Sequence, residues 1–348
     1  MKFEPHFESI ISNVFNGRGP DKDECVYLLG FAPHSLESTY MMSIANDISR
    51  KKSGNAGIMY AQIGIDVAPC SANCKFCAFA QEHFALQPKR MNMQEISECV
   101  HALADDGDLF GVFLMTTHTF DMGYLLEAVK VTRAALPSYS PVWVNVGDMS
   151  VKKARQLKEA GVEGAYHCLR LREGVDTNLD PKERLKTFNA IQKSGLSLYT
   201  CCEPIGPEHT AQEIVDRIFL SLEYGAIQLS AMRRVMIPNL PIAERGQISL
   251  LRLAQITAIL MLISVSFPQV AAAACHESNL LGLMAGSNVA AVEIGANPRD
   301  EVANTAENRG LSMNNCRRML FEAGYTSIIT AEPKAIPLTA EYLRKLGA

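Results

Sequence analysis

The sequence predicts an α/β fold, namely one (β/α)8 TIM barrel with an N-terminal helical extension and a short C-terminal tail. From residue 57 onward, eight apolar strand-like runs alternate with helical stretches. Several helical stretches end in glycine directly before the next apolar run, and no low-complexity linker divides the 348 residues. Alternating strands and helices are typical of parallel sheets, and one barrel occupies about 250 residues or more. A doubly wound open sheet is the alternative that the pattern leaves open.

The first fifty-odd residues predict a helical cap, assigned to residues 1–56. Helical patterns cover residues 5–16, 23–31 and 35–54. Ser35, followed by Glu37 and regularly spaced apolar residues, is typical of a capped helix start.

The barrel is expected over residues 57–300, and a tail packing on it over 301–348. Three helices are clear between the strands, at 93–107, 151–161 and 181–195. Apolar runs of strand length and composition indicate the strands, at 58–65, 109–117, 141–147, 164–171, 196–206, 226–232, 269–275 and 288–295.

The most apolar stretch, residues 250–267, is close to the length of a membrane span. Arg252 and Gln255 interrupt it, so it is interpreted as a buried helix running into a loop. We therefore expect no membrane association, and a cytoplasmic location because the N-terminus lacks a secretory signal.

Composition narrows the class of protein further. With 48% hydrophobic residues, the chain is neither disordered nor fibrous. A net charge of −4 with well-mixed charges gives no indication of a nucleic-acid partner. Ten cysteines in a reducing compartment favour metal binding or catalysis over disulfides.

The strongest local motif is Cys70-Ser-Ala-Asn-Cys74-Lys-Phe-Cys77, directly after the first strand. Loops that follow barrel strands carry the active sites of barrel enzymes. A structural zinc site or an electron-transfer cluster is normally completed by a fourth Cys or His, whereas three cysteines leave one iron of a cluster open. A zinc knuckle with a distant fourth ligand and a chance group of buried cysteines are the alternatives.

This loop, with Phe76 just before its last cysteine, resembles that of the radical S-adenosylmethionine (SAM) superfamily. The resemblance implies a [4Fe-4S] cluster on Cys70, Cys74 and Cys77, whose open iron binds SAM. It also implies reductive cleavage of SAM to a 5′-deoxyadenosyl radical, which abstracts hydrogen from a small-molecule or cofactor-precursor substrate. A reducing partner such as flavodoxin or ferredoxin is implied as well.

Two longer segments extend the resemblance to one subgroup. Residues 160–198 are similar to the fourth-strand region of biotin synthase and its relatives, which include methylornithine synthase and the [FeFe]-hydrogenase maturase. Residues 280–300 resemble the segment near the end of that subgroup's barrel. The chain is thus identified as biotin-synthase-like.

The same resemblance implies residues that bind SAM. Arg170, Arg172 and Glu173 follow the fourth strand, which contacts SAM in related enzymes, and a guanidinium with an acid suits its amino and carboxylate groups. No Gly-Gly-Glu signature follows the second strand, where Thr116 and Thr117 remain candidates for the methionine part. The expected SAM-binding residues are Phe76, Thr117, Arg172, Glu173, Arg234 and Ile237.

Four further cysteines, Cys168, Cys201, Cys202 and Cys275, fall on predicted strands. Neighbouring strand residues point to opposite faces, so only one of Cys201 and Cys202 faces the barrel interior. The four are candidate ligands of an auxiliary iron–sulfur cluster. Cys275, Cys202 and His276 are also candidate catalytic residues, and one candidate role is a thiol that returns a hydrogen atom to the substrate. Packing is the alternative, because parallel strands are buried on both faces.

The predicted second and third strands contain no cysteine, in contrast to the auxiliary-cluster strands of biotin synthase, so a standard biotin synthase is not supported. Two reactions stay open: sulfur insertion from an auxiliary cluster, and carbon-skeleton rearrangement without one. A non-catalytic iron–sulfur or zinc redox sensor is the other alternative. Polar candidates for the interior and mouth of the barrel are Asn145, Asp148, His167, Glu203, His276, His118 and Asp121.

Overall fold

The computed structural model describes residues 2–295, 311–332 and 334–348. Its centre is a parallel sheet in which β1 is followed in space by β3, β4, β5, β6, β7 and β8, while β9 pairs with the other edge of β1. These barrel strands are β1 (Ala56–Val67), β3 (Gly111–Thr116), β4 (Val142–Asn145), β5 (Gly164–Tyr166), β6 (Ser197–Ile205), β7 (Ala226–Arg233), β8 (Ala272–Cys275) and β9 (Val289–Ile294). All eight predicted strands are confirmed, some of them shorter than expected.

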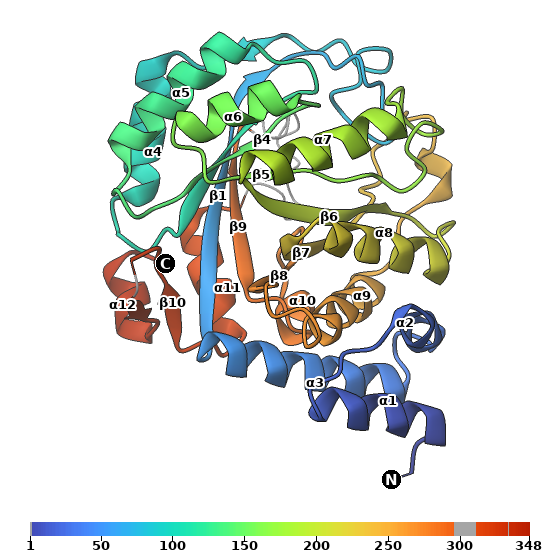
Figure 1. The fold of residues 1–348 in the computed structure, drawn as a ribbon. Helices are drawn as coiled ribbons and strands as arrows, with labels where there is room; N and C mark the ends of the chain where they lie inside the picture. Colours follow the sequence, from blue (N-terminus) through green and yellow to red (C-terminus); the bar gives the residue numbers. More distant parts are fainter. Residues whose placement is uncertain (1, 296–310, 333) are drawn as a thin grey trace.

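The remaining gap in the ring lies between β8 and β9. No ladder of strand pairing joins them among the described residues, but the Asn288 amide donates to the Ala273 carbonyl at 3.1 Å. The Cys275 amide also donates to Ser287 Oγ at 3.2 Å. The two strands therefore lie side by side, and the barrel prediction is confirmed (Figure 1).

An outer layer of helices follows the strands in the manner of repeated βα units. These helices are α4 (Met93–Ala104), α5 (Met122–Ala135), α6 (Val151–Glu159), α7 (Pro181–Ser194), α8 (Ala211–Glu223), α9 (Leu250–Ile263) and α10 (Leu280–Met284), with a 3-10 turn η1 (Ala243–Arg245) before α9. Polar side chains accept hydrogen bonds from their first-turn amides and so fix where the helices begin. The capping residues are Asn92, Asp121, Ser150, Asp180, Thr210, Ser249 and Asn279.

The N-terminal helices α1 (Pro5–Phe15), α2 (Lys22–Leu29) and α3 (Leu36–Ser53) lie against one end of the barrel beside α8, α9 and α10 (Figure 1). Ser35 caps α3 as predicted, its Oγ accepting from the Ser38 amide. α9 is buried from Leu253 to Ile263 because it lies between the sheet and α3. No helix within the described ranges combines the length and apolarity that crossing a membrane requires.

The C-terminal part contains α11 (Met313–Glu322), β10 (Ser327–Ile329), β11 (Ala335–Pro337) and α12 (Ala340–Lys345). β10 extends the sheet by pairing in parallel with Ala56–Ile58 of β1, which the sequence did not predict. A short strand β2 (Lys89–Arg90) pairs with the opposite end of β1. The expected boundary between residues 300 and 301 lies outside the described residues.

Aromatic side chains fill the half of the barrel at the amino ends of the strands. Tyr60, Phe113, Trp143 and Tyr199 come from β1, β3, β4 and β6 and contact one another with ring centroids 4.7–6.5 Å apart. Gly111 is required beside them, because a Cβ there would lie 2.7 Å from the Trp143 ring. On the side of this plug toward the carboxyl ends of the strands lies an open cavity.

Replacing Trp143 with alanine is expected to lower the free energy of unfolding by about 3–5 kcal/mol, because it leaves a cavity in the plug. Urea unfolding measures this change. The matched control, Tyr139→Ala, removes an exposed aromatic residue and should change stability by less than about 0.5 kcal/mol. Equal effects of the two substitutions would contradict the plug as a major part of the core.

Candidate active site

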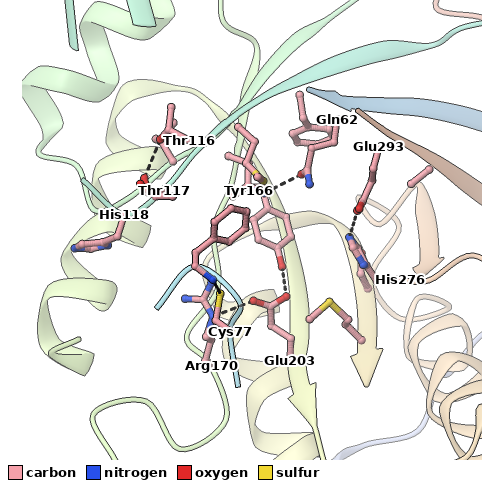
Figure 2. A pocket seen from close by; sticks show the side chains of 18 of the residues that line it. Gln62, Cys77, Thr116, Thr117, His118, Tyr166, Arg170, Glu203, His276 and Glu293 are labelled. Carbon is pink, nitrogen blue, oxygen red and sulfur yellow. Dashed lines mark hydrogen bonds and ion pairs between the residues drawn. The ribbon is translucent and has the colours of Figure 1, made fainter. Parts of the chain in front are cut away.

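A cavity of about 250 Å³ occupies the half of the barrel at the carboxyl ends of the strands. Its lining includes side chains from every barrel strand or from the loop that follows it (Figure 2). Both polar and ionisable groups line it, whereas the plug beneath is aromatic. In barrel enzymes this end carries the chemistry, so the cavity is the candidate active site.

Three cysteines reach this cavity from the loop after β1. Cys70, Cys74 and Cys77 all line it. The loop folds tightly: the Cys70 amide donates to the Phe79 carbonyl at 2.7 Å, and the Cys77 amide to the Cys74 carbonyl at 3.0 Å. Asn73 adopts the left-handed conformation with φ of 44°, which asparagine tolerates well.

The loop is also fixed from outside. The Asn178 amide donates to the Ala72 carbonyl at 2.7 Å, and the Lys75 amide to the Asp176 carbonyl at 2.9 Å. These bonds tie the cysteine loop to the segment after β5. The position of the thiols is therefore set by two βα loops together.

Three cysteines from one loop fit the donor set of an iron–sulfur cluster. Within the described ranges no three His, Cys, Asp or Glu side chains are grouped closely enough for one metal ion. In a [4Fe-4S] cluster each thiolate binds a different iron, so its thiols border a volume instead of converging on a point. Burial raises the pKa of the Cys74 thiol, which thus stays protonated until a metal displaces the proton.

Arg170, in the segment after β5, lines the cavity. Its Nε lies 3.1 Å from Glu203 Oε1 on β6. Arg172, the residue predicted for SAM binding, has a φ of 57° and pairs through Nε with Asp176 Oδ2 at 2.8 Å. Arg172 does not belong to the described cavity lining, so Arg170 occupies the place expected for it.

Glu203 is the centre of a hydrogen-bonded group at the cavity. The Tyr166 hydroxyl donates to Glu203 Oε2 at 2.6 Å (Figure 2). The Cys168 thiol donates to Glu203 Oε1 at 3.3 Å. Burial by itself raises the pKa of Glu203, but the Arg170 guanidinium and the Tyr166 hydroxyl outweigh it and hold the pKa below the ordinary 4.5. Glu203 is therefore ionised at neutral pH.

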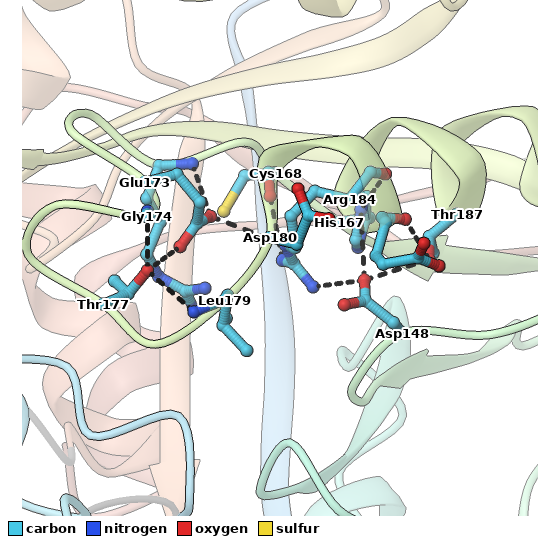
Figure 3. Close-up of polar contacts among 12 residues, drawn as sticks. Asp148, His167, Cys168, Glu173, Gly174, Thr177, Leu179, Asp180, Arg184 and Thr187 are labelled. Carbon is cyan, nitrogen blue, oxygen red and sulfur yellow. Dashed lines mark hydrogen bonds and ion pairs between the residues drawn. The ribbon is translucent and has the colours of Figure 1, made fainter.

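Glu173, also predicted for SAM binding, is buried within its own loop (Figure 3). Its Oε2 accepts from the Arg170 amide at 3.0 Å and its Oε1 from Thr177 Oγ1 at 2.7 Å. It thereby shapes the backbone that carries Arg170. Its side chain does not belong to the described cavity lining.

The sequence of the chain is similar to those of known proteins. No protein-family model matches the chain. It is 30% identical to the biotin synthase of Hydrogenobaculum sp. over 57% of this chain and 62% of that protein. It is 23% identical to the biotin synthase of Persephonella marina over 74% of this chain and 78% of that protein.

Solved structures share the fold. The crystal structure of methylornithine synthase matches with a TM-score of 0.74 at 15% identity, over 90% of this chain and 95% of that one. That of a maturase of the [FeFe]-hydrogenase matches with a TM-score of 0.75 at 16% identity, over 95% and 78%. The chain is therefore similar in sequence to biotin synthases, and it shares its fold with methylornithine synthase and the [FeFe]-hydrogenase maturase.

Two more residues near the predicted SAM position follow β3. Thr117 lines the cavity, as does His118. Thr116 Oγ1 donates to the Thr117 carbonyl at 2.8 Å. Gly147 passes so close to this segment that a Cβ would lie 1.7 Å from the His118 carbonyl oxygen, which explains a glycine there. Burial lowers the pKa of His118, so its imidazole is neutral at pH 7.

The expected catalytic and auxiliary cysteines separate in the structure. Cys275 and His276 line the cavity, and Asn279 Nδ2 donates to Cys275 Sγ at 3.4 Å. Cys202 points the other way, its Sγ 3.8 Å from the Ile214 carbonyl of α8. This position corrects the expectation for Cys202, because strand alternation places its thiol in the layer between sheet and helices.

Of the other two auxiliary candidates, Cys168 is occupied by its hydrogen bond to Glu203, and Cys201 is buried beside it. Cys275 lies two strands away from Cys201, since β7 separates β6 from β8.

The remaining SAM-binding candidates lie outside the described cavity lining. Phe76 packs beside Cys74 and Leu179. Ile237 is half-buried after β7, and its carbonyl accepts from the Leu240 amide. Arg234 forms a two-pronged ion pair with Glu208, and its Nη2 also donates to the Gly246 carbonyl at 2.8 Å. Arg234 thus holds the loop after β7 against the loop after β6.

The Arg234–Glu208 pair predicts a stability change in acid. Burial raises the pKa of Glu208, but the hydrogen bond from Arg234 outweighs it and lowers the pKa from 4.5 to about 2. The contribution of ionised Glu208 to the free energy of unfolding is complete above pH 4.5 and is lost as the pH falls toward 2. Urea unfolding between pH 5 and pH 3 should show a smaller loss of stability in Glu208→Gln than in the native protein. An unchanged pH slope would contradict this.

Among the polar candidates, Asn145, Glu203, His276 and His118 line the cavity. Asp148 and His167 do not line the cavity but bind Arg184, which does: Asp148 Oδ1 accepts from Arg184 Nη1, and His167 Nε2 contacts the Arg184 carbonyl (Figure 3). Asp121 caps α5. Sequence reasoning missed several lining residues, although period-two alternation within their strands could have placed some of them, among them Gln62, Tyr166, Gln228 and Glu293.

Proposed function

We propose that this protein is a radical SAM enzyme that abstracts hydrogen from a small polar molecule in the barrel cavity. The observation that carries the proposal is the convergence of Cys70, Cys74 and Cys77 on a cavity at the catalytic end of the barrel. The relationship to biotin synthases supports it. The match spans only 62% of the Hydrogenobaculum protein, so the activity is inferred from the site.

Cys70, Cys74 and Cys77 would hold a [4Fe-4S] cluster, with SAM bound beside it. When bound and reduced, the cluster supplies the electron that cleaves SAM to the radical that abstracts a substrate hydrogen. Arg170 and Thr117 line the cavity on the same side as candidates for contacting SAM. Glu173 acts on this contact indirectly, by fixing the Arg170 backbone.

The aromatic plug limits the access of water to the cavity from the amino ends of the strands. Exclusion of water protects reactive species from side reactions. An external reductant of the flavodoxin or ferredoxin class would supply the electrons.

Of the two reactions left open, rearrangement or another hydrogen abstraction without a second cluster is favoured. Cys202 faces α8, and Cys168 donates to Glu203, so neither thiol is oriented as a cluster ligand together with Cys275. Sulfur insertion would need an auxiliary cluster on these residues. A non-catalytic redox sensor is the remaining alternative.

The test is anaerobic reconstitution followed by an assay of 5′-deoxyadenosine with dithionite and SAM. The proposal predicts that the product forms and that iron loads to about four per chain. Absence of SAM cleavage in fully loaded protein would favour the sensor. An iron content of about eight, falling in Cys168→Ala and Cys275→Ala while SAM cleavage persists, would instead support sulfur insertion.

A further inference from the structure

One wall of the cavity is formed by the neighbouring strands β7, β8, β9 and β1. Gln228 and Ser230 come from β7, His276 follows β8, Glu293 lies on β9, and Gln62 on β1. Gln62 and Glu293 are register partners, so their Cα atoms are adjacent across the sheet. Figure 2 shows Glu293 and His276 apart from the Arg170–Glu203 group.

Glu293 differs from the other carboxylate in the cavity. Glu203 is paired with Arg170 at 3.1 Å, and Arg184 is paired with Asp148 at 2.7 Å. Each guanidinium that lines the cavity therefore has a carboxylate partner. Within the described ranges Glu293 contacts only the His276 imidazole, with Nε2 at 3.5 Å from Oε1, and no arginine or lysine. Among the described residues, this wall therefore carries a carboxylate that has no arginine or lysine partner.

A second observation on the same wall concerns hydrogen bonding. Gln228 is 7% exposed, and its Oε1 has no partner among the described residues. Its Nε2 makes a long contact of 3.4 Å with Ser230 Oγ. A buried acceptor that lacks a donor is uncommon, and beside a cavity it indicates a place for a ligand's donor. Among the described residues, the wall thus presents two acceptors to a ligand, the Gln228 carbonyl oxygen and the Glu293 carboxylate.

We infer that this wall binds a cationic amine group of the substrate, so that the enzyme acts on a small aliphatic amine or amino acid. An alkylammonium group donates three hydrogen bonds and accepts none, which matches the Glu293 carboxylate and the Gln228 carbonyl oxygen. This inference rests on the proposed function, because it places the substrate opposite the cysteine loop. It adds the substrate class and the residues that select it.

The test measures binding, without turnover, to reconstituted protein in the presence of SAM. Isothermal titration calorimetry with three probes of equal chain length compares pentylamine, 5-aminopentanoate and glutarate. Pentylamine and 5-aminopentanoate are expected to bind, with glutarate far weaker. Glu293→Gln should weaken the binding of pentylamine by about tenfold to a hundredfold, because a charge-assisted hydrogen bond is lost. Gln228→Leu should weaken it severalfold.

Glu98→Gln is the matched control, since Glu98 is on α4 with Gln94 as its partner. It should bind pentylamine like the native protein. Tighter binding of glutarate, no binding of any probe, or equal affinities of Glu293→Gln and the native protein would overturn the inference. Formation of 5′-deoxyadenosine in the absence of substrate is measured on the same samples. If the native protein forms no 5′-deoxyadenosine, the proposed function is contradicted. If it forms 5′-deoxyadenosine but Glu293→Gln binds pentylamine as the native protein does, only the amine site is contradicted.

Discussion

Replacement of Cys74 by alanine is expected to reduce bound iron from about four per chain to near zero and to abolish 5′-deoxyadenosine formation. Cys74 is the most buried of the three loop cysteines, with 7% of its surface exposed, and it lies between the other two in sequence. With two thiolates left, the cluster would have two irons without protein ligands. Iron analysis, the visible absorption of the cluster and the SAM cleavage assay measure the effect.

The matched control is Cys99→Ala, which removes a half-buried thiol on α4 that does not line the cavity. It should retain full iron and full SAM cleavage. Circular dichroism of both variants separates loss of the cluster from loss of the fold. Full iron content in Cys74→Ala would show that the cluster, if present, has other ligands.

Replacement of Glu203 by leucine is expected to lower the free energy of unfolding by about 3 kcal/mol, because it leaves the Arg170 guanidinium in the barrel without its counter-charge. It also removes the acceptor of Tyr166 and Cys168. Urea unfolding at pH 7 measures the change. Since the pKa of Glu203 is lowered from 4.5, its contribution is complete above that pH and is lost in stronger acid. The deficit of the variant should therefore shrink below pH 4.5.

A double replacement, Arg170→Met with Glu203→Leu, provides the control. Removing both charges avoids an uncompensated buried ion, so the double variant should be more stable than Glu203→Leu alone. If both variants were equally unstable, packing of the Glu203 side chain and not charge pairing would explain the loss. If Glu203→Leu were as stable as the native protein, the ion pair would have no structural role.

The sequence contained enough information for the barrel, since long apolar strands alternate with capped helices and local patterns specify both. It also located the cysteine loop, because all three thiols are close together in the chain. It did not distinguish Arg170 from Arg172. That choice depends on the left-handed backbone at Arg172 and its bond to Asp176, which are tertiary features.

Other differences have similar causes. The unit β10–β11 consists of three-residue strands, too short to show alternation, and it forms because β1 extends beyond the barrel and offers a free edge. Strand alternation predicts that Cys201 and Cys202 point to opposite faces of β6. Which of the two thiols faces the barrel interior depends on the register of β6 in the sheet. Glu293 was missed because a single acid near the end of an apolar strand has no motif around it.

The most direct measurement of the central claim is the electron paramagnetic resonance spectrum of the reduced, reconstituted protein with and without SAM. If Cys70, Cys74 and Cys77 hold a [4Fe-4S] cluster with an open iron, the spectrum should show a reduced cluster whose signal changes when SAM is added. The same protein should contain about four irons per chain. A spectrum that SAM leaves unchanged in iron-loaded protein, or a chain that binds zinc in place of iron at this loop, would contradict the account.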